Sequence, residues 1–170
     1  RINIASGIKN INIVKFCYAK KGAYIWSNVK PAFEKRYQLS KTIEFIDAMN
    51  AEIKKKRPDY VRVHDSGDYY SRSYLAKWIT IARQNPDVRF YSYTNMIDMI
   101  LKTNLPDNYD IIFSDSGKQK HLIDEERHRH TKIFDNIDVL NSAGYIDSSS
   151  IDLMATKWFS DNKKVGLIFH

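Results

Sequence analysis

A chain of 170 residues with 43% hydrophobic side chains can bury one substantial core, so we expect a single domain over residues 1–170. Its formal net charge of +7 suits an acidic partner, and its single cysteine, Cys17, excludes an intramolecular disulfide and a four-cysteine metal site, as expected for a reducing cytoplasm. No apolar run approaches the roughly 20 residues of a membrane-spanning helix, so we expect no contact with a membrane.

The first predicted element is an amphipathic helix that ends at the basic run 54–57, directly before Pro58. Its apolar stripe is formed by Phe45, Ile46, Met49 and Ile53. Cations at the carboxyl end of a helix oppose its dipole, and a proline cannot continue it. The same basic run could also belong to a basic surface.

Three short stretches rich in β-branched and aromatic residues follow, roughly 25 residues apart. They are Val61–Val63, Val88–Tyr91 and Ile111–Phe113. Apolar residues at helical spacing lie in both intervals, with Leu75, Trp78, Ile79 and Ala82 in the first and Met96, Ile97 and Ile100 in the second. Ser71 or Ser73 can cap the first helix. The pattern predicts an α/β fold, either a partial β/α barrel or a parallel sheet flanked by helices.

Short polar loops follow the three predicted strands. Because the carboxyl ends of parallel strands meet at one edge, we expect these loops to lie close together. The predicted strand-end cluster comprises His64, Asp65, Ser66, Asp68, Tyr93, Thr94, Ser114 and Asp115. The plainer interpretation is turn chemistry, in which Asp and Ser bond to local amides. The alternative is a divalent-cation site formed by His64, Asp65, Asp68 and Asp115.

Two further segments are candidates for binding. The amino-terminal third combines cations with aromatic residues, which suits a nucleic-acid backbone and its bases. The candidate contacts with nucleic acid or a partner are Lys20, Lys21, Tyr24, Trp26, Lys30, Lys35 and Arg36. On a helix, His121, Glu125 and His128 would share one face as metal ligands. Because charge-rich runs usually face water, we interpret residues 121–130 as a solvated helix or loop and predict no metal site.

Two motifs carry a resemblance to a known family. They are Phe16-Cys17-Tyr18-Ala19 and the loop His64–Asp68 after its strand. With them, most of the chain, from about residue 7 to residue 170, resembles the phage gene-product-88 domain family. The resemblance implies an origin in a phage or related mobile element and a partial barrel similar to that of radical-SAM-type proteins.

The chain departs from the family pattern at positions where that pattern expects cysteines. These positions hold Ile13, Leu153, Val165 and Ile168. An iron–sulfur cluster needs about four thiolate ligands, and three at the minimum, so Cys17 alone cannot hold one. We therefore expect no cofactor, a degenerate cluster site, and a pocket filled by these four aliphatic side chains.

Three hypotheses for function follow. The leading one is a non-catalytic accessory protein that binds a host nucleic-acid enzyme, nucleic acid, or both, in the cytoplasm of a bacterial host. Inhibition of a defence nuclease such as a CRISPR effector (an anti-CRISPR) is its most concrete form. The second is a metal-dependent enzyme that acts on nucleic acid through His64, Asp65, Asp68 and Asp115. The third is a radical-type enzyme whose cluster is held by Cys17 and by ligands from another chain.

Overall fold

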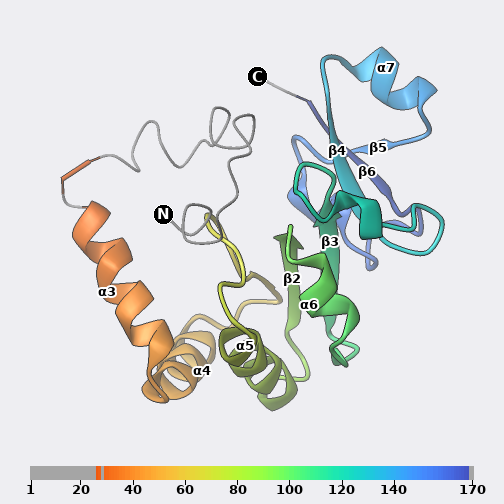
Figure 1. Cartoon of the computed structure of the whole chain (residues 1–170). Coiled ribbons are helices and arrows are strands. Elements are labelled where there is room, and N and C mark those ends of the chain that lie inside the picture. The colour runs from red at the N-terminus through yellow and green to blue at the C-terminus, as the bar shows by residue number, and fades with distance from the viewer. Residues whose placement is uncertain (1–25, 28, 169–170) are drawn as a thin grey trace.

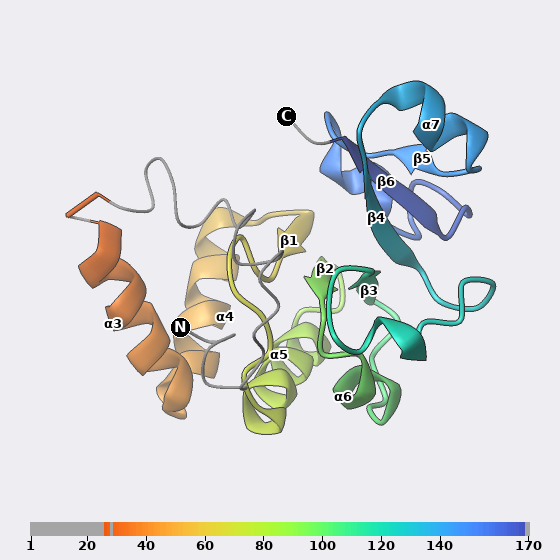
Figure 2. The ribbon, with the colours of Figure 1, turned by 45° about the horizontal axis from the view of Figure 1, so that its top comes forward.

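Six parallel β-strands form one sheet in the computed structural model, which describes residues 26–27 and 29–168 (Figure 1). In chain order they are β1 (Tyr60–Arg62), β2 (Arg89–Thr94), β3 (Tyr109–Ser114), β4 (His130–Phe134), β5 (Ile146–Asp147) and β6 (Lys164–Ile168). Their order in the sheet is β1-β2-β3-β4-β6-β5, and every neighbouring pair is parallel. The sheet curls into half of a barrel with helices on its outside (Figure 2), which confirms the predicted α/β fold.

The helices are α3 (Val29–Lys41), α4 (Glu44–Lys56), α5 (Arg72–Gln84), α6 (Ile97–Leu101) and α7 (Ile137–Ser142), with the 3₁₀ turns η3 (Lys120–Leu122) and η4 (Asp152–Ala155). Of these, α4, α5 and α6 lie where the sequence predicts them, whereas α3 was not predicted. The α5 helix begins after Ser71, whose hydroxyl accepts a hydrogen bond from the Tyr74 amide at 3.2 Å, as predicted for a cap. The α4 helix ends at Lys56 and is followed by Arg57, which has a left-handed φ of 48°. Within the described part of the chain, no helix is long and apolar enough to cross a membrane.

The main core lies between the outer face of β1–β3 and the helices α4, α5 and α6. Its most deeply buried side chains are Tyr69, Leu75, Ile81, Phe90 and Ile97. Each such apolar side chain contributes on the order of 1.5–3 kcal/mol to folding. Because side chains alternate along a strand, the outer face takes Phe90 and Ile111, while Tyr91 and Ile112 point to the inner face.

The inner face of the sheet carries a second apolar cluster, which the segment around η4 covers. Val165 is fully buried there, and Leu153 packs against the same cluster. Ile168 instead packs beside α7, in a third cluster with Phe134 and Leu140. The expectation that Leu153, Val165 and Ile168 line one pocket is therefore wrong, because residues an odd number apart on a strand face opposite sides. The fourth predicted member, Ile13, lies outside the described residues.

Candidate functional site

Asp68 joins the loops that follow β1 and β2. One carboxylate oxygen accepts hydrogen bonds from the Tyr69 amide at 2.7 Å and the Thr94 hydroxyl at 2.5 Å, and the other accepts from the Asn95 amide at 2.8 Å. Burial raises the pKa of Asp68, while these three hydrogen bonds act in the opposite direction. The predicted proximity of the two loops is confirmed. Asp68 links their backbones, because its carboxylate accepts hydrogen bonds from both loops.

His64 lies in the outer core, with 9% of its surface exposed. Its Nδ1 is 3.3 Å from the Ser92 hydroxyl, and its ring meets that of Tyr69 edge-on at 4.7 Å. The buried Nε2 has no hydrogen-bond partner among the residues described. Burial, with the charge of Arg62, lowers the pKa of His64 to about 4, so the ring is neutral at physiological pH.

The loop after β3 lies beside the loop after β2, as predicted. The Ser116 hydroxyl is 3.4 Å from Asn95 Oδ1, and a Cβ on Gly117 would collide with the Asn95 side chain. Asp115 is 3.9 Å from Lys120 Nζ. Of the other members of the predicted cluster, Asp65 is exposed, whereas Ser66, Tyr93 and Ser114 are half-buried.

The predicted cation site is not assembled, although its loops adjoin. His64 turns into the core, Asp68 is occupied by its three donors, and Asp115 faces a lysine. Across residues 26–27 and 29–168, no group of three or more His, Cys, Asp or Glu side chains is placed to hold a metal ion. The geometry therefore does not support the metal-dependent hydrolysis considered for these residues.

Residues 121–130 do not form one helix, so the helical ligand set His121, Glu125 and His128 does not form. His121 lies in η3, and His128 Nδ1 accepts a hydrogen bond from the Asp124 amide at 3.0 Å. Residues 124–127 are exposed, which confirms the interpretation of a solvated loop. Arg129 and His130 are exceptions, because both are buried. His130 lies in β4 with its Nε2 3.0 Å from the Tyr145 hydroxyl.

A polar cluster that the sequence did not reveal lies on the inner face, around Asp152. Its carboxylate accepts hydrogen bonds from the hydroxyls of Tyr91 at 2.7 Å and Tyr93 at 2.8 Å, and from Arg62 Nη1 at 3.1 Å. Burial and the charge of Asp152 raise the pKa of both tyrosines, so both remain protonated donors. The spacing of Tyr91 and Tyr93 places them on one face, but no local signal connects them to Asp152, about 60 residues later.

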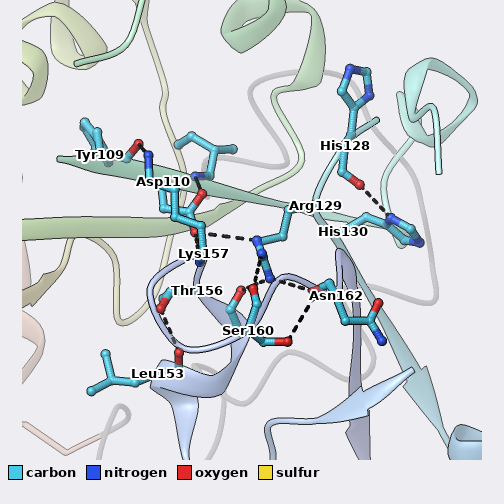
Figure 3. Close-up of polar contacts among 12 residues, drawn as sticks. Tyr109, Asp110, His128, Arg129, His130, Leu153, Thr156, Lys157, Ser160 and Asn162 are labelled. Atoms are coloured by element: carbon cyan, nitrogen blue, oxygen red, sulfur yellow. Dashed lines mark hydrogen bonds and ion pairs between the residues drawn. The ribbon is translucent and has the colours of Figure 1, made fainter. Parts of the chain in front are cut away.

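A buried ion pair fixes the segment after η4 to the sheet (Figure 3). Arg129 Nε lies 3.7 Å from Asp110 Oδ2, and the two side chains are 8% and 10% exposed. Arg129 also donates to three backbone carbonyl oxygens, those of Ala155 at 3.2 Å, Ser160 at 2.6 Å and Asn162 at 2.8 Å. Asp110 accepts from the Lys157 amide at 2.7 Å. Burial lowers the pKa of Arg129 and raises the pKa of Asp110, as expected where desolvation opposes both charges.

The predicted nucleic-acid contacts are described in part. Lys30, Lys35 and Arg36 are exposed on α3, and Trp26 is 59% exposed just before it. Lys20, Lys21 and Tyr24 lie outside the described residues.

The residues described here do not fit an iron–sulfur cluster. Leu153, Val165 and Ile168, which the resemblance led us to consider as replaced cluster ligands, are aliphatic, and an aliphatic side chain offers no ligand atom to iron. All three pack in apolar clusters. Cys17 lies outside the described residues.

Comparison with known proteins finds relatives among phage proteins. A family model described as "Gene product 88" matches residues 9–168. The "Gene 88 protein" of Mycobacterium phage L5 is 30% identical over 113 residues, which is 59% of this chain and 47% of the relative. The "Gene 88 protein" of Mycobacterium phage D29 is 30% identical over 93 residues, or 48% of this chain and 39% of the relative. The chain therefore covers less than half the length of either relative, and no solved structure matches it.

Proposed function

Because this chain belongs to the gene product 88 family, we propose that it is a non-catalytic accessory protein of a phage or related mobile element that binds nucleic acid in the cytoplasm of the host. The observation that carries the proposal is a surface of unpaired cations on α3. Both curated relatives come from phages, and nucleic acid is the acidic partner that a basic accessory protein meets in an infected cell.

The α3 helix carries four exposed cations and a single acid. The cations are Lys30, Lys35, Arg36 and Lys41, and the acid is Glu34. None of the four forms an ion pair with a described residue, and Glu34 instead accepts a hydrogen bond from Gln38 at 2.6 Å. Residues 1–33 contain no Asp or Glu, so none of them can pair with these cations. Their charges therefore remain available to phosphates.

Aromatic rings accompany two of the cations. Arg36 lies over the Phe33 ring at 5.8 Å, and Lys41 Nζ lies over the Tyr37 ring at 4.0 Å. Cations interleaved with aromatic rings suit nucleic acid, because the cations neutralise phosphates and the rings offer faces to bases.

The carboxyl end of α3 is held firmly against the rest of the fold. The Tyr37 and Tyr70 rings meet edge-on at 5.3 Å, and the Ser40 and Tyr70 hydroxyls are 2.8 Å apart. Lys77 Nζ donates to the carbonyl oxygens of Ser40 at 2.8 Å and Thr42 at 2.7 Å. A charged surface on a fixed helix loses little entropy when a ligand binds.

Inhibition of a host nuclease, such as a CRISPR effector, is the most specific form of the proposal. A protein that occupies phosphates competes with the nuclease for its guide or target strand. The phage relatives and the cationic α3 surface support this form. A cleavage assay with a loaded effector tests it, because protection of the target should disappear when the α3 cations are neutralised.

The salt dependence of binding tests the proposal itself. In the triple variant Lys30→Gln/Lys35→Gln/Arg36→Gln, the slope of log affinity against log salt for a single strand should fall by about 2, since each phosphate contact contributes roughly 0.7. The control is Lys54→Gln/Lys55→Gln/Lys56→Gln, which removes the same charge from exposed positions at the end of α4.

Comparison of the two triple variants distinguishes binding at the α3 surface from a general effect of net charge. Equal effects of the two triple variants would show that only the total charge matters, and α3 would then not be the binding surface. A wild-type protein that binds no nucleic acid even at low salt would remove the proposed function altogether.

A further inference from the structure

A second aromatic and cationic cluster lies at the amino-terminal ends of β1 and β2, where the segment after η4 reaches the sheet. Tyr60 begins β1, Arg89 begins β2, and Lys157, Trp158 and Phe159 follow η4. We call these five residues the edge surface, because β1 is an edge strand of the sheet. None of them belongs to the predicted strand-end cluster or to α3.

The edge surface is organised around Arg89. Its guanidinium lies 5.5 Å from the Tyr60 ring centroid and 5.7 Å from that of Trp158, and its Nη1 donates to the Tyr60 hydroxyl at 2.8 Å. Phe159 lies 5.7 Å from Tyr60, and Lys157 Nζ lies 5.4 Å from the Trp158 ring. Three aromatic rings and two cations are thus held in mutual contact.

The edge surface is fixed yet accessible. Tyr60 and Trp158 are half-buried, whereas Arg89 and Lys157 are exposed and Phe159 is 46% exposed. An open cavity of about 310 Å³ is lined by Tyr60 and Arg89 of the edge surface and by Asp59 and Asp87. This volume is at the small end of the range for ligand pockets, which suits a single ring system such as a nucleobase.

We propose that the edge surface binds a base of single-stranded nucleic acid, an inference that rests on the proposed function. Among the three rings of the edge surface, Phe159 offers the most exposed face for stacking, and Arg89 supplies donors to ring nitrogens and carbonyl oxygens of the base. A duplex is disfavoured because its base faces are already stacked on one another. Stacking is tolerant of sequence, since every base has a π-face.

The two acidic residues that line the cavity favour a base over a phosphate as its ligand. Asp59 and Asp87 form no ion pair with any residue of the described part of the chain, so their carboxylates remain acceptors. A carboxylate repels phosphate but accepts hydrogen bonds from the exocyclic amino groups of bases. The edge surface therefore complements the α3 surface, which carries unpaired cations for phosphates.

Phe159→Ala tests the inference by fluorescence anisotropy with a labelled mixed-sequence 12-mer, single-stranded and as a duplex. Loss of one stacked base predicts an affinity for the single strand that is about 5- to 150-fold weaker. The salt slope and the affinity for the duplex should stay as in the wild type. Phe159→Tyr should retain binding, and Ile151→Ala, at a 60% exposed site before η4, is the matched control.

Photo-crosslinking gives an independent readout. A strand that contains 5-bromouracil should form its crosslink with the aromatic residues of the edge surface, identified by mass spectrometry of the peptide that contains residues 157–159. Unchanged single-strand binding by Phe159→Ala, with crosslinks elsewhere, would overturn the inference.

The two proposals fail in different ways. If the α3 triple variant loses its salt-dependent binding while Phe159→Ala binds as the wild type does, only the edge surface is refuted. If the wild type binds neither single strand nor duplex, the proposed function is refuted, and this inference with it. An equal loss of single-strand and duplex binding in Phe159→Ala would also refute base stacking.

Discussion

Replacing Arg129 with methionine removes the side chain that holds residues 155–162 against the sheet. The variant loses three hydrogen bonds to carbonyl oxygens and leaves the Asp110 carboxyl buried without its cation. Breaking a buried pair by removal of one partner costs about 3–5 kcal/mol. A domain of this kind has a free energy of unfolding of about 5–15 kcal/mol, so the variant should lose a large share of its stability.

Urea denaturation, followed by far-ultraviolet circular dichroism and tryptophan fluorescence, measures the change in the free energy of unfolding. The control is Arg127→Met, whose side chain is 84% exposed in a pair with Asp124 and should change stability by less than about 0.5 kcal/mol. Asp110→Asn should cost less than Arg129→Met, because Arg129 keeps its three carbonyl partners and burial already disfavours the charged form of Asp110. A loss below about 1 kcal/mol for Arg129→Met, with an unchanged denaturant slope, would refute the reasoning.

Two further predictions concern the loop after β1. Burial keeps His64 neutral and lowers its pKa from 6.5 to about 4. The neutral ring therefore contributes up to about 3 kcal/mol to the free energy of unfolding above pH 6.5, and this contribution is lost as the pH falls through 4. His64→Phe should flatten this part of the pH dependence of urea unfolding; an unchanged acid profile would contradict the assignment. Asp68→Asn turns an amide toward one of three donors and should lower the free energy of unfolding by about 1–3 kcal/mol in the same assay. The control Asp107→Asn, at an exposed position, should lower it by less than about 0.5 kcal/mol. Equal effects of the two variants would contradict the role of Asp68 in linking the loops.

Local periodicity predicted the first half of the sheet. The apolar spacing of α5 and the β-branched and aromatic strands β1–β3 carry their own signals, so these elements lie where the sequence places them. The later strands are less visible, since β5 has two residues and β4 follows the charge-rich residues 124–129. Without β6, Val165 and Ile168 could not be assigned to opposite faces.

The candidate site was predictable only where parallel strands impose neighbours. The loops after β1, β2 and β3 adjoin, as the topology requires. The burial of His64 was not predictable, because it depends on the packing of Tyr69 and Tyr74 around the ring. Contacts such as Asp152 with Tyr91 join residues 61 apart and leave no local pattern in the sequence.

The segment that follows β5 connects the stability of the fold with the proposed edge surface. Asp152 is bonded to two tyrosines at one end, and the Lys157 amide is bonded to Asp110 further on. Trp158 and Phe159 therefore stand on backbone that is fixed before any ligand arrives, which lowers the entropic cost of stacking a base. Variants of Arg129 would alter this support together with the surface, so they cannot separate folding from binding. A variant of Phe159 can separate folding from binding, because the Phe159 side chain is 46% exposed and takes no part in the hydrogen bonds by which Arg129 fixes this segment.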